Sequence, residues 1–201
     1  FLLAFAAAAL LAPALGPQKP KPKEPPPDYF PLRAGDWWKY KSTTSTGATS
    51  EFTIKVLSAD KQADGTILYQ VETVAGAKPM IHDWYSKPAG WVVDHKQLYL
   101  ANNMSASFEP ARQYLKNPPS AGSTWSWKGK GMMNVAIDET SKAVGAEEVV
   151  VPAGRFQAIR VDTAVTQGGT PVAKSYWYAN WIGLVKSATD SSGVKSSTEL
   201  I

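Results

Sequence analysis

Cysteine is absent from the 201-residue chain, and histidine occurs only twice. The lack of cysteine excludes disulfide bonds, thiolate metal sites and cysteine nucleophiles. We therefore expect the fold to be stabilised by packing alone.

The common catalytic motifs are missing as well. The sequence contains no Gly-x-Ser-x-Gly elbow, no P-loop, no dinucleotide-binding glycine pattern and no His-Glu-x-x-His segment. Glu147 and Glu148 are adjacent, so on a strand they point to opposite faces. A glycosidase-type carboxylate pair from distant parts of the chain is left open. The sequence nevertheless predicts a protein that is not an enzyme and that needs no cofactor.

Neither sign of charge dominates. The net charge is +4, and Lys19, Lys21 and Lys23 in the N-terminal part contribute to it. The remaining chain is close to neutral and has no basic stripe, so nucleic-acid binding is not expected.

The first fifteen residues, 1–15, are apolar and rich in alanine. They are short for a membrane span, which needs ~20 residues, but they fit the apolar region of a secretory signal. The segment Ala12-Pro13-Ala14 provides a cleavage site, so we expect the mature chain to begin near Leu15 and to have no transmembrane span. An uncleaved anchor or a short buried helix is the alternative.

Residues 16–28 form a predicted linker with six prolines at positions 17–27. Proline removes backbone donors and favours an extended path. We interpret the linker as a spacer that holds the following domain away from a surface, with a binding motif for a protein partner as the alternative.

Residues 29–201 predict a single, mainly β domain. Eight Trp and eight Tyr are typical of sheets with aromatic faces. Phe52, Ile54 and Val56 alternate with polar residues, and Asp64-Gly65 is a hairpin turn signal. About eleven short strands follow one another, with one short helix expected at 108–116. The pattern predicts an antiparallel meander that curls into a half-barrel or open barrel.

Similar sequence features recur in two parts of the chain, which suggests an internal duplication of residues 35–100 and 122–190. Gly35 and Gly122 lie 87 residues apart, and each precedes a Trp by three positions. Trp84 and Trp177 lie 93 residues apart. Two copies placed edge to edge could share one curved sheet.

Three segments resemble a known group of proteins: residues 29–38, residues 151–156 and residues 176–186. They are similar to segments of bacterial envelope proteins of unknown function, which in turn resemble the LolA/LolB-like lipoprotein-carrier fold. The resemblance covers about residues 29–190. It implies a curved antiparallel sheet around an apolar concavity, and a location in the periplasm or cell envelope.

A four-residue turn at Lys87–Gly90 would place His82 opposite His95 and Asp83 opposite Asp94. Two histidines on one face are weak candidates for metal ligands, because no third ligand is visible. The simpler interpretation is two partly exposed histidines. The unfavourable pairing of two aspartates suggests either a shifted register or a compensating lysine such as Lys96.

Aromatic residues are the remaining site candidates. The simplest interpretation is that they belong to the core, but some of them could line a concavity that accepts a lipid or another apolar ligand. The candidates are Trp38, Tyr40, Trp84, Trp125, Trp127 and Tyr178.

The sequence thus supports two hypotheses. The first is a non-enzymatic exported envelope protein that binds an apolar ligand inside a curved sheet. The second is a scaffolding protein with a filled core, which acts on an envelope partner through its surface and its proline-rich tether. Saturable binding of a hydrophobic probe distinguishes the two.

Overall fold

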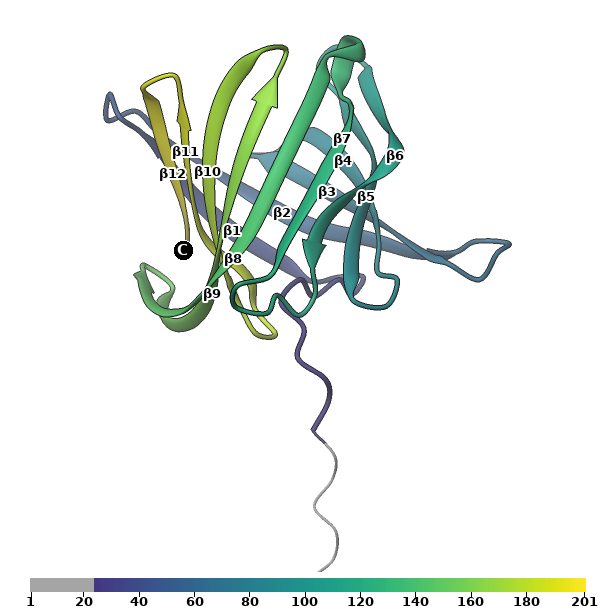
Figure 1. Cartoon of the computed structure of the whole chain (residues 1–201), viewed down its shortest axis with the longest axis horizontal. Coiled ribbons are helices and arrows are strands. Elements are labelled where there is room, and N and C mark those ends of the chain that lie inside the picture. Colours follow the sequence, from purple (N-terminus) through teal and green to yellow (C-terminus); the bar gives the residue numbers. More distant parts are fainter. Residues whose placement is uncertain (1–23) are drawn as a thin grey trace, which may run out of the picture.

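Strands make up nearly all the regular structure in residues 24–201, the part of the chain that this computed structural model describes (Figure 1). The predicted signal segment and most of the linker lie outside the described residues. The strands are β1 (Trp37–Thr44), β2 (Thr49–Lys61), β3 (Ile67–Ala75), β4 (Lys78–Ser86), β5 (Trp91–Tyr99), β6 (Met104–Lys116), β7 (Thr124–Lys130), β8 (Ala136–Val151), β9 (Gly154–Gln167), β10 (Thr170–Ala179), β11 (Gly183–Ser191) and β12 (Val194–Leu200). One short 3₁₀ helix, η1 (Met132–Asn134), precedes β8.

All twelve strands belong to one antiparallel sheet. Its order is β6-β5-β4-β3-β2-β1-β12-β11-β10-β9-β8-β7. Two six-stranded meanders, β1–β6 and β7–β12, are therefore joined where β1 pairs with β12. The sheet curls into a nearly closed barrel whose unsealed seam lies between β6 and β7, which confirms the predicted open barrel of antiparallel strands. Within residues 24–201, no helix has the length and apolar character needed to cross a membrane.

The prediction of a short helix at 108–116 is wrong, because these residues belong to β6. The composition favours a helix, but exposed and buried side chains alternate over residues 105–109, with Ala106 and Phe108 buried. Pro110 is accommodated because β6 is an edge strand at the seam, where its missing N–H leaves no ladder bond unmade. Tertiary packing here outweighs helix propensity.

The seam is closed by side chains. Trp127 on β7 is buried, donates its indole N–H to the carbonyl oxygen of Pro110 on β6 (2.9 Å), and packs edge-on against Phe108. Gly129 makes room for this ring, since a Cβ atom there would lie 2.2 Å from Trp127 Cζ2. A second contact across the seam joins Trp125 to Trp91, with ring centroids 6.3 Å apart. Aromatic packing thus replaces the missing ladder of backbone hydrogen bonds.

The two halves share their irregularities as well as their strand order. The N–H of Gly35 donates to the carbonyl oxygen of Val56 (2.9 Å), and that of Gly122 donates to the carbonyl oxygen of Ala143 (2.7 Å). The register of β2 against β3 shifts directly after Val56, and that of β8 against β9 directly after Ala143.

A second pair of shifts follows Trp84 in the β4–β5 hairpin and Trp177 in the β10–β11 hairpin. Gly90, in the turn after β4, and Gly183, at the start of β11, both have positive φ, 78° and 91°. These correspondences agree with an internal duplication. The common origin of the two halves stays a prediction.

Candidate functional site

One end of the barrel is covered by residues Asp28–Pro31, which we call the N-terminal strap (Figure 1). Three turns of the barrel hold it. The Asp28 carboxylate accepts hydrogen bonds from Lys87 Nζ (2.5 Å) and Asn117 Nδ2 (2.7 Å), and the Asp28 carbonyl accepts one from the N–H of Trp181 (2.7 Å). Burial raises the pKa of Asp28, but the hydrogen bonds from Lys87 and Asn117 and the charge of Lys87 outweigh it and hold the pKa below its usual value. The strap is therefore an integral part of the barrel end.

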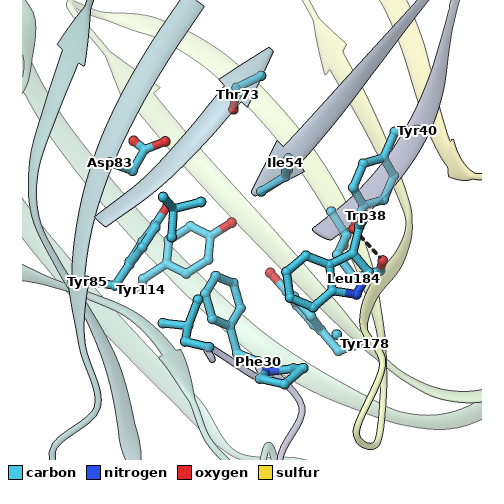
Figure 2. A pocket seen from close by; sticks show the side chains of 14 residues that line it. Phe30, Trp38, Tyr40, Ile54, Thr73, Asp83, Tyr85, Tyr114, Tyr178 and Leu184 are labelled. Atoms are coloured by element: carbon cyan, nitrogen blue, oxygen red, sulfur yellow. Dashed lines mark hydrogen bonds between the residues drawn. The ribbon is translucent and has the colours of Figure 1, made fainter. Parts of the chain in front are cut away.

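Phe30 is the residue of the strap that enters the barrel. Its ring meets Tyr85, Tyr114 and Tyr178 at centroid distances of 5.3, 5.7 and 6.4 Å. Tyr85, Tyr114 and Tyr178 come from β4, β6 and β10, so one ring links strands that are far apart in the sheet. Figure 2 shows Phe30 at the base of a cavity between these strands.

The cavity inside this end of the barrel has a volume of about 110 Å³. Three of the aromatic candidates, Trp38, Tyr40 and Tyr178, line it (Figure 2). Tyr40 is oriented by a hydrogen bond from its hydroxyl to the carbonyl oxygen of Leu184 (2.8 Å). The remaining lining residues are mostly aromatic or aliphatic: Phe30, Pro31, Leu32, Ile54, Val71, Thr73, Asp83, Tyr85, Tyr114, Gly183 and Leu184.

The other three aromatic candidates do not line the cavity. Trp125 and Trp127 are buried, and each reaches across the seam. Trp84 lies between two inward-facing residues, Asp83 and Tyr85, and so points to the outer face, where Lys96 Nζ stands 5.0 Å from its ring centroid. The structure therefore brings only half of the candidate set together.

The histidines are not opposite each other, so the predicted pairing is wrong. A bulge in β5 leaves His95 unpaired, and His82 faces Leu98 while Asp83 faces Gln97. The hairpin turn itself places Ser86 opposite Val93 and Tyr85 opposite Asp94, so the two aspartates do not face each other. This is the shifted register that the like charges suggested.

Each histidine instead has its own polar neighbour. His82 Nε2 lies 2.9 Å from Glu72 Oε1, and His95 Nε2 lies 2.8 Å from the hydroxyl of Ser86. Burial lowers the pKa of His95. Ser86 is itself only 3% exposed, so this serine–histidine pair is not placed for attack on a substrate. In the part of the chain that the structure describes, no three His, Asp or Glu residues are grouped to hold a metal ion.

A group of charged residues lies inside the barrel beyond the cavity, and the sequence analysis missed it. Arg112 on β6 donates two hydrogen bonds to Glu139 on β8 (2.7 and 2.6 Å) and lies 3.7 Å from Asp94 on β5. Burial lowers the pKa of Arg112, but the charge of Glu139 outweighs it, so the pKa is raised. We call Asp83, Asp94, Arg112, Glu139 and Lys174 the interior charge cluster.

Burial has the largest effect on the pKa values of Asp94 and Lys174. It raises the pKa of Asp94 well above the usual value, and one carboxylate oxygen of Asp94 has no hydrogen-bond partner among the described residues. Burial also lowers the pKa of Lys174. In both cases the uncharged form is favoured because water is excluded.

Asp83 connects the cluster to the cavity. It is 8% exposed and lines the cavity wall, where Figure 2 shows its carboxylate. Oδ1 accepts a hydrogen bond from Gln97 Nε2 (2.8 Å). Burial raises the pKa of Asp83 to about 6, although the Gln97 hydrogen bond and the charge of Arg112 oppose the rise.

The raised pKa predicts how stability depends on pH. Between about pH 4 and pH 6 the folded state keeps a proton on Asp83 that the unfolded state has lost, so stability falls as pH rises through this range. Asp83→Asn keeps the acceptor for Gln97 but carries no charge. We expect it to raise the free energy of unfolding at pH 7 by roughly 1–3 kcal/mol and to flatten this part of the pH profile.

Urea denaturation between pH 4 and pH 8 checks this expectation. Asp138→Asn is the matched control, because Asp138 forms a largely exposed ion pair with Lys128. A D83N variant that is less stable than the wild type at pH 7 would contradict the argument.

Part of this site could have been found from the sequence. Asp83 and Tyr85 alternate with His82 and Trp84, so strand parity alone places one carboxylate on the same face as an aromatic residue. No local signal pairs Arg112 with Glu139, which are brought together across the seam between β6 and β7.

Comparisons with solved structures show the same fold in distant proteins. A protein of Bacteroides fragilis NCTC 9343, described as exported and as having a YmcC-like fold, superposes with a TM-score of 0.58 at 16% identity. The match covers 87% of this chain and 97% of that protein. A protein of Parabacteroides distasonis ATCC 8503, described as a lipoprotein, gives a TM-score of 0.51 at 13% identity, covering 88% and 98% of the two chains. The likeness to the LolA/LolB-like carrier fold stays a prediction.

Comparison of sequences adds the family. A search of curated proteins finds no match to this chain. The profile of the DUF3108-like family, however, matches residues 61–200, which is most of the chain and all strands from β3 to β12. This protein therefore belongs to the DUF3108-like family.

Proposed function

We propose that this protein is an exported protein of the periplasm or cell envelope that binds a small ligand, at least partly apolar, in the barrel cavity and performs no catalysis. The observation that carries the proposal is the cavity itself, whose wall is made of aromatic and aliphatic side chains with one carboxylate. Binding sites of this kind combine an apolar wall with a few polar groups that orient the ligand.

The size of the cavity limits the ligand. A cavity of about 150 Å³ in another protein accepts benzene, so about 110 Å³ suits a compact group or a short alkyl chain. A whole lipid would require the barrel to open, for example by displacement of the N-terminal strap. We therefore favour a small amphiphile over a lipid carried entirely within the barrel.

The strap also sets the orientation of the barrel. Residues 24–27 are exposed, have no regular secondary structure and contain three prolines. They lead directly into Asp28, so the tether leaves from the covered end. A protein held by this tether presents the opposite end of the barrel away from its attachment point, which suits a spacer role for the linker.

Titration with 1-hexanol tests the proposed binding. We expect saturable changes in the methyl NMR signals of Ile54 and Val71, two aliphatic residues of the cavity wall. Ile54→Phe should abolish the changes by filling the cavity. Leu57→Phe is the matched control on the same strand, because Leu57 is 44% exposed.

A scaffolding protein with a filled core is the second candidate, and the small size of the cavity favours it. On that hypothesis the surface and tether contact an envelope partner, and hexanol produces no saturable change in either the wild type or the L57F variant. That result would contradict the ligand-binding proposal.

Export is supported by the descriptions of the two structural neighbours as an exported protein and a lipoprotein, together with the apolar residues 1–15. We expect the protein recovered from the envelope fraction to begin near Leu15. Mass spectrometry that finds residues 1–14 intact would contradict cleavage, and recovery from the cytoplasmic fraction alone would contradict export.

A further inference from the structure

The cavity wall contains an acidic residue but no basic one. Of the fourteen residues in its wall, Asp83 is the only charged one, and none is basic. Lys174 belongs to the interior charge cluster but does not line the cavity. Asp83 is therefore the one side chain of the wall that can carry a charge near neutral pH, and that charge is negative.

Asp83 has no cationic partner in the described part of the chain. Arg112, whose charge lowers the pKa of Asp83 more than that of any other basic residue, is held by two hydrogen bonds to Glu139. No ion pair joins Asp83 to a basic side chain in residues 24–201, and its one side-chain hydrogen bond, from the neutral amide of Gln97, goes to Oδ1. Oδ2 accepts no hydrogen bond from residues 24–201.

The rest of the wall is rich in aromatic rings. Six aromatic residues surround the cavity: Phe30, Trp38, Tyr40, Tyr85, Tyr114 and Tyr178. Aromatic rings attract cations through their negatively polarised faces, and sets of such rings recognise quaternary ammonium groups. The same rings would not favour a carboxylate or phosphate, because their faces repel negative charge.

We propose that the cavity binds the ammonium group of a small organic cation, with Asp83 as its counter-ion and the six aromatic rings as its enclosure. This inference rests on the proposed ligand-binding function and adds the chemical class of the ligand. A trimethylammonium group is apolar on its surface and positively charged as a whole, so it matches both parts of this wall. The compact volume of about 110 Å³ is consistent with such a group.

Three ligands of equal chain length test the inference: hexyltrimethylammonium, 1-hexanol and hexanoate, each titrated at pH 8 by calorimetry and by methyl NMR of Ile54 and Val71. At this pH Asp83 is ionised, since its pKa is about 6. We expect hexyltrimethylammonium to bind roughly tenfold more tightly than hexanol, and hexanoate to bind most weakly.

Asp83→Asn removes the charge of the cavity wall while nearly keeping its shape, so it separates their contributions to binding. In D83N the preference for the ammonium ligand over hexanol should fall to about twofold, which the rings alone provide. Asp138→Asn, on the surface, should leave the tenfold preference unchanged. Circular dichroism of both variants confirms that the fold is retained.

The outcomes are distinct. Equal binding of all three ligands, or tightest binding of hexanoate, would overturn the cationic ligand while leaving ligand binding intact. A preference that persists in D83N would overturn the role of Asp83. Failure of all three ligands to bind would overturn both the inference and the proposed function.

Discussion

Replacing Arg112 with methionine is expected to lower the free energy of unfolding by about 3–5 kcal/mol at pH 7. Arg112 lies inside the barrel and is the cationic partner of Glu139 and Asp94. Without it, the Glu139 carboxylate is left buried with no cation beside it, and Asp94 loses the charge that opposes its protonation. The expected cost comes mainly from the uncompensated charge of Glu139 and not from lost packing, since methionine replaces most of the arginine stem.

The loss should also depend on pH. Carboxylates without a cation have raised pKa values and bind protons as the pH falls, so the R112M deficit should shrink between pH 7 and pH 4.5. Urea denaturation at both pH values measures this change. Adding Glu139→Gln to R112M should restore part of the stability at pH 7, because it removes the uncompensated charge.

Arg155→Met is the control for this experiment. Arg155 forms an exposed ion pair with Glu148 and should cost less than about 1 kcal/mol. An R112M variant whose deficit at pH 7 is as small as that of R155M, or is unchanged at pH 4.5, would show that the interior charge cluster does not contribute in the way described.

Replacing Trp127 with alanine is expected to cost about 3–5 kcal/mol and to open the seam. The indole of Trp127 contacts Phe108 and donates a hydrogen bond to Pro110, both on β6, and no backbone ladder joins β6 to β7. Truncation removes the packing and the hydrogen bond together. Amide hydrogen exchange should therefore accelerate in β6 and β7 before it does in β1, β2 and β12.

Trp127→Phe divides this effect into two parts. It keeps a ring against Phe108 and loses the hydrogen bond to Pro110, so its cost should be about 1–3 kcal/mol. Trp37→Ala is the matched control, because Trp37 is 63% exposed on β1 and should change stability by less than about 1 kcal/mol. Equal exchange rates in β6 of W127A and the wild type would contradict the assigned role of Trp127.

Local sequence patterns were sufficient for much of the fold. The alternation of Phe52, Ile54 and Val56 correctly predicts one inward face of β2, and glycine-containing turns such as Asp64-Gly65 mark where strands reverse. These predictions succeed because the two-residue period of a strand and the φ > 0 requirement of tight turns act on neighbouring residues only.

Strand register and the identity of β6 were not predictable in the same way. The turn at residues 87–90 and a bulge at His95 together set the register of β4 against β5, so His82 faces Leu98 and does not meet His95. A bulge has no reliable local signal, because it depends on how the partner strand curves. Residues 108–116 have helix-forming composition, and only the need for a strand at the seam makes them extended.

Alternation and turn chemistry are properties of adjacent residues, so the chain alone was enough to predict an antiparallel, aromatic-rich open barrel, although β8 and β9 are longer than the short strands expected. Tertiary structure alone decided what the barrel contains. Phe30 comes from the strap before β1, Asp83 from β4, Arg112 from β6 and Glu139 from β8, and no spacing rule connects them. Strand parity indicates which side chains point inward. Whether an inward-facing aspartate meets an arginine, a glutamine or an empty cavity depends on barrel closure and strand register. Both arise from contacts between residues far apart in the chain.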